Sequence, residues 1–434
     1  MTITNTAYVT GEMEFAALIG VDWGDASHAI ALWDTATGGI ESITLRHTPE
    51  DVHTWLEALE QRFGGRPVAL ALESSKGPLV HALLHVPWLR LYPIHTSTSA
   101  RYRAAFRPSG AKDDMPDAHV LLDLVRHHRD KLKPLCAEDE ATRRLDALCQ
   151  ARRAAVDQRT QLTNQLTSTL KGYYPQALLW AGEKLHQPLA LAFLEKWPDL
   201  LALKAAREGT IRKFFYAHNV RRAESVEQRL QAIASARALT TDEAIVEVSV
   251  RMMQMLVEEL RVVQKHITRF DQAIREVFAA HPEAELFREL PGAGPALAPR
   301  LLTVFGTDRS RYPDADSLLK YSGLAPVKEK SGRREWIHWR WNAPHFVRQS
   351  LIEWAGQTVM FCDWSRAYYQ RQKKKGVGHW AVIRALAFKW VRVLWRCWQN
   401  RTPYNEARYL EALKRRGVSV SPDISHGNFF SKPT

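Results

Sequence analysis

The stretch Leu18-Ile19-Gly20-Val21-Asp22-Trp23 is a short apolar run that ends in a carboxylate, the pattern of a buried strand with an acidic residue at its end. Further strand-like runs lie at residues 28–34, 41–47, 67–73 and 89–95. A helical stretch at residues 49–62 separates the third strand from the fourth. Three early strands that can form a meander, followed by a strand, a helix and a strand, predict an α/β domain with a mixed central sheet. We place this domain at residues 15–135.

The rest of the chain predicts two helical units and a tail, so the expected fold is α/β plus all-α. Long helical patterns fill residues 136–285, and helices rich in Trp and Arg continue through residues 286–416. The last segment, residues 417–434, is polar and predicts disorder. The length of 434 residues suits more than one core, since single cores stop growing near about 250–300 residues.

Apolar residues repeat with steps of four and three in the second unit, as in a heptad seam. The seam consists of Leu256, Leu260, Val263, Ile267, Phe270, Ile274 and Val277. A looser seam consists of Leu145, Leu148, Ala155, Leu162 and Leu166. Two such helices with a helical insertion between them are typical of an antiparallel coiled-coil arm, which can also mediate dimerisation. An ordinary buried helix pair within one protomer explains the pattern equally well.

Basic residues outnumber acidic ones, since 60 Lys and Arg against 47 Asp and Glu give a formal net charge of +13. This excess favours a polyanionic partner, because neutralised phosphates release counterions and supply affinity that is independent of sequence. The four cysteines lack the spacing of a zinc site and predict reduced thiols in a cytoplasmic protein. The N-terminus has no secretory-signal pattern, and basic residues interrupt the most apolar helical stretch, residues 382–398, so no membrane segment is expected.

Four acidic residues occur in the order and setting of a two-metal site. Asp22 and Glu73 end predicted strands, and Asp114 and Asp117 begin a predicted helix, where a spacing of three places both carboxylates on one face. Mg²⁺ and Mn²⁺ prefer oxygen ligands, and two such ions can stabilise the attacking and leaving oxygens of a phosphoryl transfer. Each acid alone is also typical of a turn or helix cap, a role open to their neighbours Asp25, Asp34 and Asp113. The prediction therefore depends on the complete set.

Asp22, Glu73 and the pattern Lys112-x-Asp114-x-x-Asp117-Ala118 together resemble the DEDD family of insertion-sequence transposases. The N-terminal domain of that family is similar to RuvC-type Holliday-junction resolvases, and relatives include site-specific DNA invertases and recombinases guided by a bridge RNA. The resemblance implies an RNase H-like (RuvC-like) fold, a metal site at the four acids, Mg²⁺ or Mn²⁺ as cofactor, and nucleic-acid contact by Lys112. It also implies a bacterial, nucleoid-associated protein.

The sequence Leu290-Pro291-Gly292-Ala293-Gly294-Pro295 lies between two helical segments of the third unit. Proline and two glycines permit a tight turn whose backbone N–H groups can face a phosphate, as in a helix-hairpin-helix element. We therefore expect Gly292 and Gly294 to contact the nucleic-acid backbone. The same sequence is also a good turn between two helices with no ligand.

Downstream, Tyr321-Ser322-Gly323-Leu324-Ala325-Pro326 and Lys330-Ser331-Gly332 resemble motifs of the same family, in which the serine before the glycine is a nucleophile that attacks DNA. The resemblance assigns this role to Ser331. Ser322 stands where the family usually has alanine, which makes it a control. By its residue type alone, a Ser-Gly pair in a basic loop is most often a turn.

After Ser331 the chain departs from the Gly-rich and Lys-rich continuation that is common in the family. Residues 327–401 contain sixteen Lys and Arg against four Asp and Glu, interleaved with tryptophans that can stack on bases. Helical spacing instead indicates that Trp390 to Trp398 are core. We expect nucleic-acid binding at residues 333–341 and 371–375. The binding residues expected there and just before are Lys330, Arg333, Arg334 and Arg340.

These features predict a DNA recombinase of an insertion sequence, with an acidic metal site and a serine that forms a covalent bond to DNA. The resemblance further implies a structured guide RNA and a homo-oligomer, either a dimer or a tetramer. Two alternatives stay open. One is a metal-dependent, structure-specific endonuclease that uses water, and the other is a catalytically silent nucleic-acid-binding protein.

Overall fold

The computed structural model describes residues 14–73, 75–106 and 114–415 and divides into two units. The first ends at Ala137 and the second begins at Glu138. Lys112, for which we expected nucleic-acid contact, and the tail at 417–434 lie outside the described residues.

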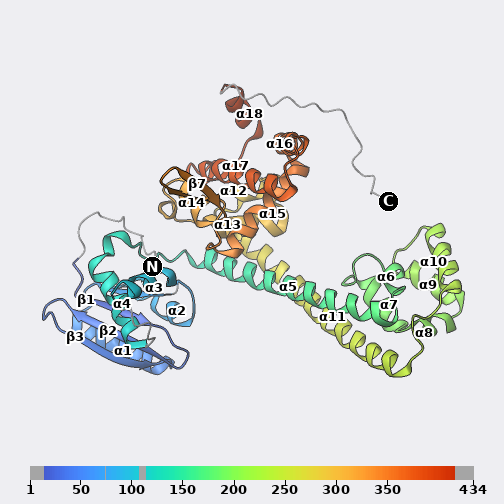
Figure 1. Cartoon of the computed structure of the whole chain (residues 1–434), viewed down its shortest axis with the longest axis horizontal. Helices are drawn as coiled ribbons and strands as arrows, with labels where there is room; N and C mark the ends of the chain where they lie inside the picture. The colour runs from blue at the N-terminus through green and yellow to red at the C-terminus, as the bar shows by residue number, and fades with distance from the viewer. Residues whose placement is uncertain (1–13, 74, 107–113, 416–434) are drawn as a thin grey trace. The chain divides into compact units, whose positions relative to one another are not determined.

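A five-stranded mixed sheet forms the centre of the first unit (Figure 1). Its strands are β1 (Ala17–Asp22), β2 (Ser27–Asp34), β3 (Ile40–Arg46), β4 (Val68–Leu72) and β5 (Leu89–Pro93). The strand order is β3-β2-β1-β4-β5. β1 pairs antiparallel with β2 and parallel with β4, and β4 pairs parallel with β5. The α/β domain with a mixed sheet that the sequence predicted is therefore confirmed.

The two faces of this sheet differ in side-chain size. On one face, β1 and β4 contribute Ile19, Val21, Leu70 and Leu72 to a core with helix α1 (Pro49–Phe63). On the other face the strands contribute mainly small residues to a second core, namely Ala29, Ala31, Ala69 and Ala71. Helix α4 (Asp114–His127) packs on this small-residue face. Small residues allow the helix to approach the sheet closely, and this approach determines where its first turn lies.

The remaining helices of the first unit connect these elements. They are α2 (Pro78–Leu83), α3 (Thr96–Phe106) and the short 3-10 helix at Arg129–Lys131. Helix α1 begins at the N-cap Thr48, whose side chain accepts a hydrogen bond from the Asp51 amide, and is followed by Gly64 with φ 60°.

Two long helices, α5 (Glu140–Tyr173) and α11 (Glu243–Ala280), lie side by side in the second unit (Figure 1). Five of the seven expected seam residues on α11 are buried, while Phe270 and Val277 are half-buried. On α5, Leu145, Leu162 and Leu166 are buried. This pair connects two separate cores within the unit.

One core lies at the end of the pair where α5 ends and α11 begins, and it contains the helical insertion. The insertion consists of α6 (Ala177–Trp180), α7 (Pro188–Lys196), α8 (Leu200–Ala205), α9 (Glu208–Ala217) and α10 (Ala223–Ser235). The sequence of this segment predicts helices and little more.

The other core includes the start of α5 and the end of α11 together with the C-terminal helices. These are α12 (Ala284–Arg288), α13 (Gly294–Phe305), the 3-10 helix Arg309–Arg311, α14 (Ala315–Tyr321), α15 (His345–Phe361), α16 (Asp363–Lys374), α17 (His379–Gln399) and α18 (Glu406–Arg415). Trp390 and Trp398 are fully buried, as their helical spacing predicted. In the described part of the chain no helix is long and apolar enough to cross a membrane.

The expectation of helices throughout residues 286–416 is wrong at one place. Residues 327–338 form an antiparallel hairpin of β6 (Val327–Ser331) and β7 (Arg334–His338). The turn between the strands is Gly332-Arg333, and Gly332 has φ 58°, which glycine adopts without strain. Eight of the ten strand residues carry polar or charged side chains or tryptophan, and this composition hid the strand pattern.

Candidate active site and nucleic-acid interface

Two of the predicted acids, Asp22 and Glu73, meet at one edge of the sheet. β1 and β4 are parallel neighbours with Val21 opposite Leu72, so Asp22 and Glu73 follow at the next level of the register. Alternation along a strand sends residues two apart to the same face. Asp22 therefore shares the face of Gly20, and Glu73 shares the face of Ala71, which packs in the core under α4. Both carboxylates consequently point to the side of the sheet that α4 covers.

Helix α4 brings the other two acids to this side of the sheet. A Cβ atom placed on Gly20 would lie 2.1 Å from the carbonyl oxygen of Ala118, so only glycine permits this approach. Asp117 precedes Ala118 and is buried, with 5% of its surface exposed, whereas Asp114 at the first position of the helix is exposed. The structure therefore brings Asp22, Glu73 and Asp117 to one region, with Asp114 one helical turn further out.

Two residues that sequence reasoning missed contact these acids. Nε of Arg103 on α3 lies 2.8 Å from Oδ1 of Asp117. The hydroxyl of Ser99, also on α3 and fully buried, donates a hydrogen bond to Glu73. No motif marks either residue, because helix α3 belongs to a generally basic segment. The helix nonetheless supplies a cation and a hydroxyl to two of the four carboxylates.

The donor chemistry of the four acids fits a hard divalent cation, since all are carboxylates carried by strand ends and one helix start. Within residues 14–73, 75–106 and 114–415, however, no group of three or more His, Cys, Asp or Glu side chains is arranged closely enough to hold a metal ion. A cation bound at Asp117 would have to share this carboxylate with Arg103 or displace the guanidinium.

A histidine pair, of which His28 is buried and His47 is half-buried, supports the loop that follows Asp22. The Gly24 amide donates to Nδ1 of His28 at 3.3 Å, and Nε2 of His28 lies 2.9 Å from Nδ1 of His47. Because an amide can only donate, His28 is neutral and carries its proton on Nε2. Burial, followed by repulsion from His47, lowers the pKa of His28. The ring of Trp23, about half exposed, stacks beside His28.

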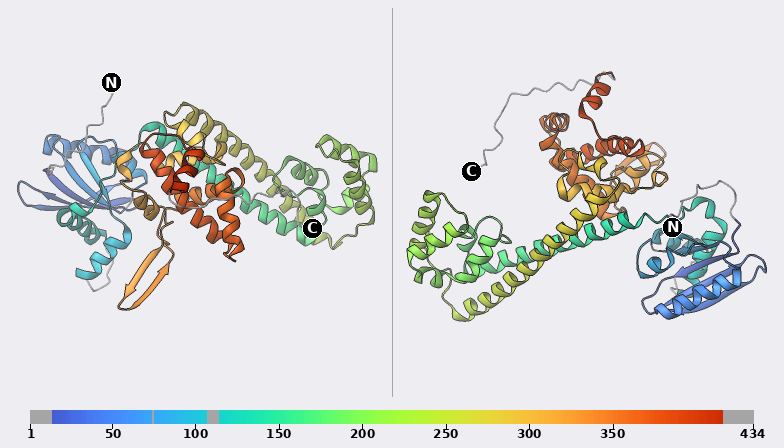
Figure 2. Two further views of the ribbon diagram at one scale, coloured as in Figure 1. Left: turned by 90° about the horizontal axis from the view of Figure 1, so that it is seen from above. Right: turned by 180° about the vertical axis from the view of Figure 1, so that it is seen from behind.

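Ser331 lies at the end of β6, at the tip of the exposed hairpin, which extends away from the surrounding helices (Figure 2, left). Its cross-strand partner is Arg334, and Lys330 and Arg333 flank it in the chain. Ser322, by contrast, is fully buried after α14, where its hydroxyl donates to the Leu319 carbonyl. The acids belong to the first unit and Ser331 to the second.

Two arginine side chains hold the base of the hairpin, the segment that follows β7, through contacts with the Trp339 ring. The guanidinium groups of Arg348 and Arg384 lie 5.5 Å and 5.0 Å from the centre of the Trp339 ring. Arg348 also donates to the carbonyl of Arg340 at 3.1 Å, which holds the chain after β7. Arg340 is half-buried at the base of the hairpin, so it is less accessible than Arg333 and Arg334.

The predicted turn at residues 290–295 connects α12 to α13 and overlaps the first two residues of α13. Gly292 has φ 69° and Gly294 has φ 54°. Pro291 is held from α15, since Nε1 of Trp354 donates to its carbonyl at 3.0 Å. A Cβ atom on Gly292 would lie 3.0 Å from backbone and side-chain atoms of Gln357, whereas a Cβ atom on Gly294 would meet nothing within 4 Å.

The second basic cluster, residues 371–375, ends α16 and leads to the start of α17. Its four cations, Arg371, Lys373, Lys374 and Lys375, are all exposed, and so is the neighbouring Trp380, at 64%. The hydroxyl of Tyr369 on α16 lies 2.8 Å from Nδ1 of His379 on α17, and this hydrogen bond connects the two helices beside the cluster. The described side chains thus combine positive charge with an accessible aromatic ring, which suits nucleic acid.

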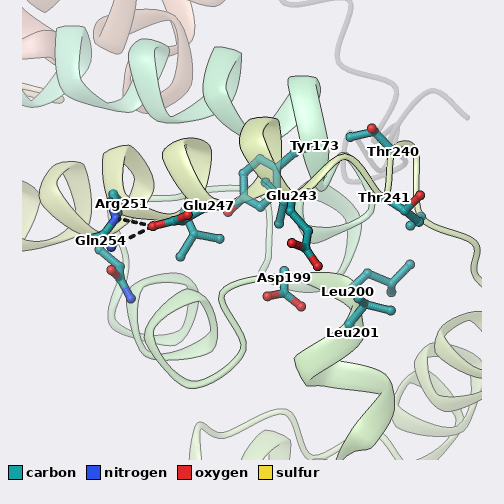
Figure 3. Close-up of a pocket in the computed structure, with 13 residues that line it drawn as sticks. Tyr173, Asp199, Leu200, Leu201, Thr240, Thr241, Glu243, Glu247, Arg251 and Gln254 are labelled. Carbon is teal, nitrogen blue, oxygen red and sulfur yellow. Dashed lines mark hydrogen bonds and ion pairs between the residues drawn. The ribbon is translucent and has the colours of Figure 1, made fainter.

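A pocket of about 570 Å³ lies at neither place but between α8 of the helical insertion and the start of α11 (Figure 3). Its charged lining is mainly acidic, with Asp199, Glu243 and Glu247, and Glu247 is paired with Arg251 at 2.8 Å. Asp199 accepts a hydrogen bond from the Ala202 amide as the N-cap of α8. An acidic lining disfavours phosphate, and the pocket therefore does not match the nucleic-acid partner that the overall charge favours.

Comparison with known proteins shows which class of protein this chain resembles. A family model described as transposase, of the IS110 DEDD type, matches residues 19–175, which contain all four acids. A second model, described as transposase of the IS116/IS110/IS902 family, matches residues 284–370, which contain the glycine turn and the hairpin. Two separate stretches of the chain thus match models of transposase domains from the IS110/IS116 family of insertion sequences.

Particular relatives align over almost the whole chain. The mini-circle putative transposase for IS117 of Streptomyces coelicolor is 27% identical, and the alignment covers 93% of this chain and 98% of the relative. The insertion element IS116 uncharacterized 44.8 kDa protein of Streptomyces clavuligerus is 28% identical over 87% of this chain and 93% of its own length. The insertion element IS900 uncharacterized 42 kDa protein of Mycobacterium paratuberculosis is 26% identical over 89% and 97%.

Proposed function

We propose that this protein is the recombinase of an insertion sequence, which breaks and rejoins DNA strands with Ser331 as nucleophile and four carboxylates as a metal site. The observation that carries the proposal is the placement of Asp22 and Glu73 at neighbouring strand ends, on the face of the sheet that α4 covers, with Asp117 in the first turn of that helix. The strand order and directions support the RNase H-like fold that the resemblance implies.

In this reaction the Oγ of Ser331 forms an ester bond to a DNA phosphorus, and the bond from phosphorus to the leaving deoxyribose oxygen breaks. The serine proton is transferred to solvent, and the leaving oxygen takes up a proton. A hydroxyl of another strand then attacks the phosphoserine bond and releases the serine, so no bond energy is lost to water. Arg334, the cross-strand partner of Ser331, would neutralise the phosphate under attack.

Asp22, Glu73, Asp114 and Asp117 would hold Mg²⁺ or Mn²⁺. When bound, such an ion supplies positive charge that stabilises the oxygen anions of phosphoryl transfer. Within the chain itself, α3 keeps Asp117 and Glu73 in place through Arg103 and Ser99. The turn at Gly292 and Gly294 and the cations Lys330, Arg333 and Arg340 would contact the nucleic-acid backbone.

The proposal includes a homo-oligomer and a structured guide RNA. Support for the oligomer is a row of exposed apolar residues on α11 with steps of three, four, three and seven. The row consists of Ile245, Val248, Met252, Met255 and Val262. Val248→Glu together with Met252→Glu should lower the molar mass measured by light scattering. The guide RNA rests on the family resemblance alone, and RNA that co-purifies with the protein would test it.

The decisive experiment incubates the full chain, with any co-purifying RNA, with its element-end DNA and Mg²⁺. We expect a protein–DNA adduct that is stable in SDS, is lost in Ser331→Ala and persists in Ser322→Ala. Cleavage without an adduct that still depends on Asp22 would identify a nuclease that uses water. DNA binding without cleavage in any variant would identify a silent binding protein.

A further inference from the structure

The β6–β7 hairpin has two faces of different chemistry. Antiparallel partners share a face and residues two apart in a strand return to it, so the register assigns each side chain. One face carries the pairs Ser331 with Arg334, Glu329 with Trp336, and Val327 with His338. The opposite face carries the pairs Lys330 with Glu335 and Lys328 with Ile337.

On the face of Ser331, Trp336 is held in one orientation although it is not buried. Its Nε1 donates to Oε2 of Glu329 at 2.8 Å, and Oε1 of the same carboxylate lies 2.8 Å from Nε2 of His338. Trp336 is nevertheless 45% exposed. The polar edge of the indole is thus satisfied within the hairpin, and the accessible part of the ring is apolar.

The charges on this face are ordered along the hairpin. Arg334 at the tip is cationic and lies opposite Ser331, whereas Glu329 one pair further down is anionic and bonded to Trp336. A phosphate is therefore attracted to the tip and repelled from the position of Trp336. Trp336 follows Arg334 by two residues, which corresponds to about 7 Å along a strand, close enough for parts of one nucleotide to reach both side chains.

We propose that Trp336 stacks on the nucleobase next to the phosphate that Ser331 and Arg334 contact. This inference rests on the proposed function and adds the form of its substrate. A base can stack on Trp336 only after it has left the duplex stack, so this face of the hairpin binds a single-stranded or flipped-out nucleotide. Every base presents an aromatic face, so the contact fixes the position of the strand without reading its sequence.

A matched control lies on the next residue of the same strand. Ile337 is exposed at 64% but points to the opposite face, towards Lys328. The test measures binding of the full chain in a Ser331→Ala background to a fluorescent single-stranded oligonucleotide by anisotropy. Trp336→Ala should weaken binding about tenfold, Trp336→Phe should retain most of the affinity, and Ile337→Ala should change it by less than about twofold.

A second experiment keeps Trp336 intact, because Trp336→Ala could weaken binding simply by unfolding the hairpin. It cross-links the protein to DNA. An oligonucleotide that contains iodouracil, irradiated on the Ser331→Ala protein, should give an adduct that mass spectrometry maps to Trp336. Equal losses for Trp336→Ala and Ile337→Ala, or cross-links elsewhere but none on this face, would overturn the inference. A second copy of the chain on this face would instead make the Trp336 effect depend on protein concentration, which also contradicts it.

The two proposals fail in different ways. Absence of an SDS-stable adduct with wild-type protein would refute the serine chemistry and leave the binding result intact. A serine adduct that forms equally well in wild type and Trp336→Ala, at every DNA concentration, would refute the stacking alone.

Discussion

Gly20 of β1 lies against the backbone of Ala118 of α4 so closely that a single methyl group would come within 2.1 Å of the Ala118 carbonyl oxygen. Asp22 is two residues after Gly20 on the same face of the strand, and Asp117 is the neighbour of Ala118. The contact between the two small residues therefore sets the separation of two acids that belong to different elements. The geometry of the candidate metal site depends on a position that carries no functional group.

Gly20→Ala should destabilise the first unit by roughly 3 kcal/mol, because the added methyl group meets backbone atoms that cannot rotate away. The helix must shift, and this moves Asp114 and Asp117 away from Asp22. We expect a lower thermal midpoint and loss of recombination even where the protein stays folded. Gly209→Ala is the control, since nothing lies within 4 Å of that position, and it should leave both properties nearly unchanged.

Arg103→Ala should lower the stability of the protein without divalent cations, because it removes a partly buried guanidinium from the buried carboxylate of Asp117. Mg²⁺ or Mn²⁺ at millimolar concentration should restore much of the loss, since the cation takes over the charge at this carboxylate. Differential scanning fluorimetry with and without the metal measures both effects. If the two cations raise the melting temperature of wild type and Arg103→Ala equally, the guanidinium and the metal do not share Asp117.

Arg46→Ala provides the comparison for that experiment. The ion pair of Arg46 with Asp51 is exposed at the arginine, with 76% of its side chain accessible. Exposed pairs contribute at most about 1 kcal/mol, so this variant should melt close to wild type and show no added response to metal.

The stability of the first unit should fall as the pH drops below about 6.5, because burial lowers the pKa of His28. In this range the unfolded chain binds a proton at His28 that the folded chain does not, so protons favour unfolding. The contribution of His28 to stability is complete above the ordinary histidine pKa. It decreases as the pH falls and becomes constant below the lower pKa that His28 has in the folded state. His28→Gln should lose this contribution.

The measurement is the difference in unfolding free energy between wild type and His28→Gln, taken at several values between about pH 7.5 and 5.5. Subtracting the variant cancels other titrating groups such as His281, whose pKa burial also lowers. The difference should shrink toward acid pH. A difference that is constant with pH would show that His28 has the same pKa in the folded and unfolded chain.

Much of the first unit could be predicted from sequence because local pattern and tertiary role coincide there. Apolar runs ending in Asp22 and Glu73 are buried parallel strands, and the small residues between them indicate the face on which a helix lies closely. Arg103 could not be predicted, since a basic residue in a basic segment gives no sign of its partner. Its contact with Asp117 exists only through the packing of α3 on α4.

The hairpin escaped prediction for a different reason. Its strands pack on no core, so both faces are polar and the alternation that marks a half-buried strand is absent. An isolated two-stranded hairpin is only marginally stable in water, and here cross-strand pairs such as Lys328 with Glu335 stabilise it. The family resemblance therefore selects Ser331, whereas its position at the tip of a hairpin could not be predicted from the sequence.

The glycine turn before α13 gives the last prediction. Gly292 and Gly294 both have positive φ, so alanine at either position costs roughly 1–2 kcal/mol of backbone strain. At Gly292 the methyl group also presses on Gln357 of α15, which cannot yield without moving the helix that carries Trp354. Gly292→Ala should therefore destabilise the protein more than Gly294→Ala in denaturant titrations, and Gly294→Asn should cost least because asparagine tolerates this conformation. Equal losses at the two positions would mean that α15 does not press on the turn. Contact of this turn with the DNA backbone predicts a second effect. Under conditions where Gly292→Ala is folded, its affinity for duplex DNA should be lower than that of wild type, whereas the affinity of Gly294→Asn should stay near wild type.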